Sequence, residues 1–156
     1  MDNILKDTYS LNQLEHRLVV LKSFLLQKFF GLEKETNPLT EDDSSWLKSL
    51  PNDFLNSFNK DNVYKIFEEL EKKLTEIHAL IIYLTFEPDD SSLTQIGEFA
   101  RKTFNNPTLI LDIKYDPTLV AGTALSWKGI YRDYSLKSSL EQRKQVVLES
   151  FKRFLR

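Results

Sequence analysis

The chain has 156 residues, enough for one ordinary hydrophobic core or for one small core with a helical appendage. Its 41% hydrophobic, 12% aromatic and 28% charged residues are typical of a folded chain and exclude a disordered one. The lack of cysteine excludes disulfide bonds, thiolate metal sites and a cysteine nucleophile, and a net charge of -2 disfavours nucleic-acid binding.

A long amphipathic helix is predicted over residues 10–31. Its apolar residues recur every three or four positions, at Leu11, Leu14, Leu18, Leu21, Leu25, Phe29 and Leu32. Ser10 is the expected N-cap and Gly31 the expected end. Further apolar residues widen the stripe, so the helix should be covered from more than one side. Because Lys22 interrupts its most apolar stretch, we expect neither a signal core nor a membrane span.

The next segment is acidic, with ten carboxylates against four lysines over residues 33–71. Residues 33–45 are polar and contain Pro38, which predicts a connector. Short helices are expected at about 44–58, with a break at Pro51. A second long helix is predicted at about 61–77, with Asp61 as its cap.

The pattern changes after residue 78. Residues 78–86 are rich in β-branched and aromatic side chains and predict a strand, which a helix over 89–104 follows. Further strands are predicted at 108–113, 119–127 and 130–134, the last two joined as a hairpin through Lys128 and Gly129. Residue 136 begins an amphipathic helix that continues to the end. This last segment is basic, with six cationic and two acidic side chains over residues 137–156.

This order of elements predicts an α+β fold. Residues 1–78 are expected to form a helical N-terminal half, and residues 79–156 a small C-terminal β-α-β-β-α domain.

No catalytic, cofactor-binding or metal site is predicted. The two histidines, His16 and His78, have no second ligand at metal-binding spacing. Four glycines in the chain cannot form a phosphate-binding loop of either common type. The paired carboxylates, such as Asp89 and Asp90, lie in a linker, on a charged helix face or in a first helical turn, where a structural role is favoured.

The aromatic residues allow two interpretations. Phe24, Phe29, Phe30, Trp46, Phe54 and Phe58 either build the core, which is favoured, or form a groove for a partner helix. Trp127, Tyr131 and Tyr134 lie near basic residues, but without an RNA-binding signature a packed hairpin is the favoured interpretation.

Residues 111–140 carry the most specific pattern, LDIKYDPTLVAGTALSWKGIYRDYSLKSSL. It resembles the C-terminal signature of the delta subunit of F-type ATP synthases, the oligomycin-sensitivity-conferring protein family. The matching residues are Asp116, Pro117, Leu119, Val120, Gly122, Gly129, Asp133, Ser135 and Leu140. Ala121 replaces the first glycine of the family's pair. The resemblance extends loosely back to about Leu80, whereas the N-terminal half is shorter than the family's six-helix domain.

The resemblance implies a non-catalytic stator subunit without cofactors, which links the catalytic head of an ATP synthase to its peripheral stalk. It implies two partners, the alpha subunit and the b subunit, and a cytoplasmic location at the inner face of the plasma membrane through the complex. Leu18, Leu21, Phe24, Leu25 and Phe29 are candidates for the alpha-subunit contact, and Arg143, Lys144, Phe151 and Phe154 for the b-subunit contact. The alternative is a small helical adaptor or dimerisation module unrelated to ATP synthase.

Overall fold

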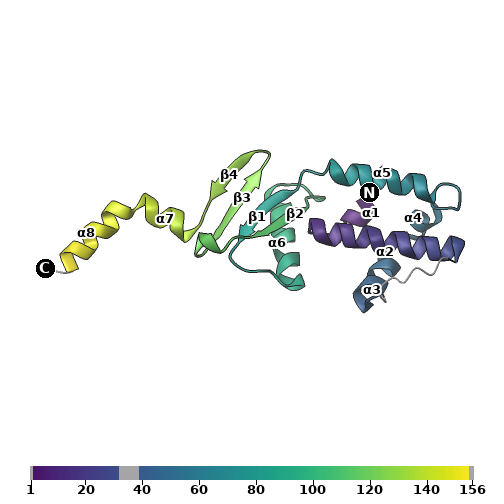
Figure 1. Ribbon diagram of the computed structural model, residues 1–156, viewed down its shortest axis with the longest axis horizontal. Coiled ribbons are helices and arrows are strands. Elements are labelled where there is room, and N and C mark those ends of the chain that lie inside the picture. The colour runs from purple at the N-terminus through teal and green to yellow at the C-terminus, as the bar shows by residue number, and fades with distance from the viewer. Residues whose placement is uncertain (1, 32–38, 155–156) are drawn as a thin grey trace.

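The structure is a computed structural model that describes residues 2–31 and 39–154. Three parts follow one another along its length (Figure 1). The helical N-terminal half forms one end, a sheet lies in the middle, and the last two helices lead away from the sheet at the other end.

Among the residues that the structure describes, the helical half contains one long helix and four shorter ones. They are α1 (Asp2–Leu5), α2 (Leu11–Phe30), α3 (Glu41–Ser49), α4 (Asn52–Asn56) and α5 (Val63–Thr75). The predicted caps of α2 are confirmed. The Ser10 side chain accepts from the Gln13 N–H, and Gly31 ends the helix in the left-handed conformation, at φ 63°.

Two local predictions in this half are wrong. Helix α3 begins inside the segment expected to be a connector, because Thr40 and Asp43 form a reciprocal capping box that satisfies two free N–H groups. Asp61 does not cap α5. Asn62 occupies the N-cap position and makes no side-chain cap bond there; its side chain instead accepts from the Asn59 N–H and donates to the Ser57 carbonyl.

One hydrophobic core holds the helical half together. Leu14, Leu21 and Leu25 of α2 are fully buried, and α5 contributes Val63 and Phe67. The core also includes Trp46 and Phe58. The interpretation as core is therefore confirmed for Trp46 and Phe58, and Phe24, Phe29 and Phe54 pack partly buried against this core. It is wrong for Phe30, which is 39% exposed.

Four short strands form one mixed sheet. They are β1 (Leu80–Leu84), β2 (Leu111–Tyr115), β3 (Thr123–Trp127) and β4 (Ile130–Asp133), in the order β2-β1-β3-β4. β1 pairs parallel with β2 and antiparallel with β3, and β3 pairs antiparallel with β4. The predicted α+β fold class is confirmed.

Helix α6 (Asp90–Thr103) connects β1 to β2 and covers one face of the sheet. Its cap is Asp89, whose carboxylate accepts from the Ser92 N–H. Alternate residues of β1, namely Leu80, Ile82 and Leu84, are buried in the core that this face shares with Ala100. The side chains of β1 thus alternate between the two faces of the sheet, as expected of a strand, and those on one face fill the second core.

Several boundaries in the C-terminal part differ from those predicted. The strand expected over 78–86 is the shorter β1, and the strand expected over 108–113 is β2, which begins and ends later. The strand expected from residue 119 begins only at β3, because the one-turn helix η1 (Pro117–Leu119) and a bend precede it. The single helix expected from residue 136 is divided into α7 (Leu136–Gln142) and α8 (Lys144–Phe154) at Arg143. In the described parts of the chain, no helix has the length and apolarity that crossing a membrane requires.

Candidate docking surfaces

The loop between β2 and β3 holds the first residues of the motif. Asp116 Oδ1 accepts from Thr118 N (2.9 Å) and Oγ1 (2.6 Å), so the carboxylate caps η1, and Pro117 occupies its first turn. The Asp116 N–H donates to the Leu84 carbonyl at 2.8 Å. These bonds fix the loop to the end of β1, and Leu119 is buried beneath it.

Val120 is held in a strained turn. Its φ of 67° and ψ of -55°, with the Ala121 N–H donating to the Leu119 carbonyl at 2.8 Å, define a γ-turn of the rare positive-φ kind. A β-branched residue is unfavourable there. The turn leaves the Val120 side chain 68% exposed. Ala121 is not among the residues with positive φ, so the alanine at this family position introduces no strain of that type.

Gly122 allows the loop to approach the start of α7. Its φ is 92°, and a Cβ there would lie 2.7 Å from the Tyr134 carbonyl oxygen and 3.0 Å from Ser135 Cα. Gly122 thus lies at a close approach of two backbone segments, in the bend before β3. The Leu136 N–H donates to the Ala121 carbonyl at 2.8 Å, which ties α7 to the same loop.

Asp133 and Ser135 fix the first turn of α7, with Ser135 as its N-cap. Ser135 is fully buried, and its hydroxyl accepts from the Ser138 N–H at 3.1 Å. Asp133 Oδ1 accepts from the Ser135 N–H at 2.8 Å. Hydrogen bonding from the Ser135 side chain, and after it from the Ser135 N–H, lowers the pKa of the Asp133 carboxyl.

Gly129 allows a tight turn between β3 and β4, whereas Gly122 allows a close contact between backbone segments. Lys128 and Gly129 both have positive φ, at 49° and 79°, and Trp127 pairs with Ile130 across them. This is the geometry of a two-residue type I′ hairpin turn, which confirms the predicted hairpin. A Cβ on Gly129 would meet nothing within 4 Å.

The arm formed by α7 and α8 projects from the sheet (Figure 1). It exposes large apolar side chains: Leu136, Leu140, Val146, Leu148, Phe151 and Phe154. Leu148, Phe151 and Phe154 are spaced by three, so they share one side of α8. Phe154 is 93% exposed and Phe151 64%, and the candidate residues Arg143 and Lys144 are also exposed.

The candidate residues of the helical half lie mostly inside it. Leu18, Leu21 and Leu25 belong to the core, whereas Phe24 and Phe29 are half-buried at its edge. The apolar side chains exposed on this half are different ones. Val19 is 62% exposed, and Phe30 and Tyr64 form an aromatic pair with their ring centroids 5.9 Å apart.

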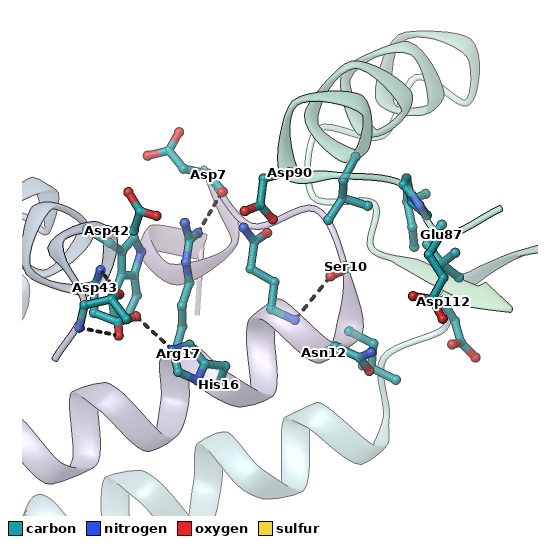
Figure 2. A pocket seen from close by; sticks show the side chains of 18 of the residues that line it. Asp7, Ser10, Asn12, His16, Arg17, Asp42, Asp43, Glu87, Asp90 and Asp112 are labelled. Atoms are coloured by element: carbon teal, nitrogen blue, oxygen red, sulfur yellow. Dashed lines mark hydrogen bonds and ion pairs between the residues drawn. The ribbon is translucent and has the colours of Figure 1, made fainter. Parts of the chain in front are cut away.

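An acidic cleft that the sequence did not reveal lies where the helical half meets the sheet (Figure 2). Its volume is about 990 Å³. The carboxylates that line it are Asp7, Asp42, Asp43, Glu87, Asp90 and Asp112. They come from segments that are distant in sequence, so no local motif could have predicted the cleft.

Two polar side chains of α2, His16 and Arg17, line one wall of the cleft. His16 Nε2 lies 2.8 Å from Asp43 Oδ1 and links α2 to α3 (Figure 2). Burial acts to raise the pKa of Asp43, but hydrogen bonds from Thr40 and His16 outweigh it and leave the pKa lowered. Burial lowers the pKa of the Arg17 guanidinium, against the opposing effect of Asp7 and Asp43. Within the described residues, no group of three or more His, Cys, Asp or Glu side chains could hold a metal ion.

The fold is that of an α+β protein, and the sequence motif forms the turns, helix caps and start of the projecting helical arm. Residues 59–147 match the family described as ATP synthase delta (OSCP) subunit. Because the match spans more than half of its 156 residues, the chain belongs to this family, which is that of a non-catalytic ATP synthase subunit. A comparison with curated proteins gave no match.

Proposed function

We propose that the protein is a stator subunit, which holds the catalytic head of an F-type ATP synthase to its peripheral stalk. The observation that carries the proposal is the family match over residues 59–147. A stator must resist rotor torque by binding two partners at once, and it needs docking surfaces in place of reactive groups. The proposed location is the inner face of the plasma membrane, through the complex.

The proposed division of labour assigns residues 79–156 to the b subunit of the stalk. The exposed stripe Leu148, Phe151 and Phe154 on α8 supports this assignment, since a row of apolar residues on one side of a helix fits the groove or apolar face of a partner helix. The neighbouring cations Lys152 and Arg153 favour a partner with acidic side chains around its apolar stripe.

The proposed division assigns residues 1–78 to the alpha subunit. Leu18, Leu21 and Leu25 would then support the docking surface from within, while half-buried Phe24 and Phe29 would contact the partner. The exposed apolar residues Val19, Phe30 and Tyr64 extend the surface that an amphipathic segment could cover.

The C-terminal contact is tested with the purified chain and the soluble part of the b subunit. The double variant Leu148→Ser and Phe151→Ser removes two of the three stripe residues without changing charge, and we expect it to abolish most of the binding. Val146→Ser is the matched control, because Val146 is also exposed but lies roughly 140–160° around the helix from those two residues.

Three outcomes would count against this function. If the tagged chain is recovered from its host without alpha and b subunits, it is not a stator component. If Val146→Ser weakens b-subunit binding as much as the double variant does, the stripe is not the contact. If the isolated chain is a stable homodimer that the double variant converts to a monomer, the arm serves self-association and the adaptor alternative is favoured.

A further inference from the structure

The two halves of the molecule are joined twice. The covalent connection is residues 76–79, which run from the end of α5 to the start of β1. Residues 5–10, which we call the strap, make a second connection, because they leave α1 and pass along the sheet half before α2 begins. A single linker allows relative motion between halves, whereas two separated connections oppose it.

The strap extends the sheet beyond β2. The Leu111 N–H donates to the Tyr9 carbonyl at 2.8 Å, and Ser10 forms a parallel bridge with Leu111. The neighbouring Ile110 is 1% exposed and belongs to the core of the helical half. One strand end of the sheet half is thus bonded to the strap and buried in the other half.

Arg101 of α6 donates hydrogen bonds to several carbonyl groups of the strap. Its guanidinium donates to the carbonyls of Leu5 and Lys6, both at 2.8 Å, and to that of Thr8. Its Nε donates to the Leu109 carbonyl at 3.2 Å. A planar guanidinium with five donors suits this task, which a lysine ammonium cannot fulfil in the same geometry.

Tyr9 packs against α6, where its ring contacts Arg101 and Gly97. The guanidinium carbon of Arg101 lies 4.5 Å from the centre of the Tyr9 ring. The ring covers Gly97, where a Cβ would lie 2.4 Å from Tyr9 Cδ1. Glycine at this position of α6 therefore admits the ring.

The strap is also fixed to the helical half. Arg17 of α2 donates to the Asp7 carbonyl and to Thr8 Oγ1, each at 2.7 Å. The Tyr9 N–H donates to Gln13 Oε1 at 2.9 Å. A force on α2 therefore passes through the strap into α6 without depending on residues 76–79.

We infer that the strap, locked by Arg101 and seated on Gly97, holds the helical half and the sheet half as one rigid body. In the stator, and resting on the function proposed above, this lock keeps the two partner-binding ends at a fixed separation. Arg101 is a positioning residue, since it contacts neither of the proposed docking surfaces.

The test measures the distance between the halves in the isolated chain. Because the chain has no cysteine, Glu69→Cys and Gln95→Cys, both at exposed positions, introduce the only two sites for spin labels. Pulsed electron paramagnetic resonance then reports the distance distribution. We expect one narrow peak for the labelled chain and loss of that peak in Arg101→Met. Arg132→Met, at an exposed arginine of β4, is the matched control and should keep the narrow peak.

Arg101→Lys tests whether the planar set of hydrogen-bond donors, and not the positive charge alone, holds the strap. It keeps the positive charge but not the planar set of donors, and we expect it also to lose the narrow peak. Gly97→Ala, which displaces the Tyr9 ring, serves as a second route to the unlocked state if Arg101→Met does not fold.

A broad distribution in the unsubstituted chain would overturn the inference, and so would a narrow peak that survives in both Arg101→Lys and Gly97→Ala. The distance is measured without ATP synthase. A confirmed lock in a chain that binds neither alpha nor b would therefore refute the proposed function alone.

Discussion

Replacing Gly122 with alanine tests the loop that anchors the arm. Two costs add at this position. Alanine is disfavoured at the φ of 92°, by about 1–2 kcal/mol. Its Cβ would also lie 2.7 Å from the Tyr134 carbonyl oxygen, and since that atom belongs to the backbone it cannot rotate away. Shifting the backbone adds about 1–3 kcal/mol.

The expected loss in the free energy of unfolding is therefore about 2–5 kcal/mol, which lowers Tm by roughly 5–15 °C for a chain of this size. Thermal unfolding followed by far-UV circular dichroism measures it. Gly129→Ala is the matched control, because its φ is 79° but its Cβ would meet nothing within 4 Å. It should cost only about 1–2 kcal/mol.

The comparison of the two variants decides whether the close approach matters. If Gly122→Ala unfolds at the same temperature as Gly129→Ala, or above it, the contact with residues 134 and 135 does not constrain the loop. The account of how the motif directs α7 would then be refuted.

Three further predictions concern capping, pH and burial. Ser135→Ala removes a buried N-cap and should cost about 1–2 kcal/mol, read as a lower midpoint in urea unfolding. Because the pKa of Asp133 is depressed in the folded state, its carboxylate stabilises the fold above a pH of about 4, and this contribution is lost as the pH falls through the folded value. The Tm difference between the unsubstituted chain and Asp133→Asn should thus be larger at neutral pH than at about pH 2–3; a constant difference would contradict this. Leu21→Ala should cost about 2–5 kcal/mol because Leu21 is fully buried, whereas Phe154→Ser at a 93% exposed position should change the stability by less than about 0.5 kcal/mol.

The sequence predicted the features that depend on neighbours along the chain. Ser10 and Gly31 bound α2 because a hydroxyl N-cap and a left-handed glycine are local devices. The hairpin at Lys128 and Gly129 is equally local. The missed start of α3 was also readable, since Thr40 and Asp43 have capping-box spacing, but the acidic run around them hid it.

The features that the sequence did not predict arise from contacts between distant segments. Arg101 binds the carbonyls of residues 5, 6 and 8, more than ninety positions away, and backbone acceptors leave no pattern in the sequence. The acidic cleft is likewise assembled from separate segments. The burial of Leu18, Leu21 and Leu25 could not be separated from partner binding, because periodicity identifies an apolar face but not what covers it.

The central claim, that the chain couples the head to the stalk without taking part in chemistry, is tested most directly in membranes. Membrane vesicles from host cells lacking this chain should hydrolyse ATP without pumping protons, since an unheld head turns with the rotor. Addition of the purified chain should restore ATP-driven proton pumping, and the Leu148→Ser and Phe151→Ser variant should not. Proton pumping that persists at full strength without the chain would contradict the account.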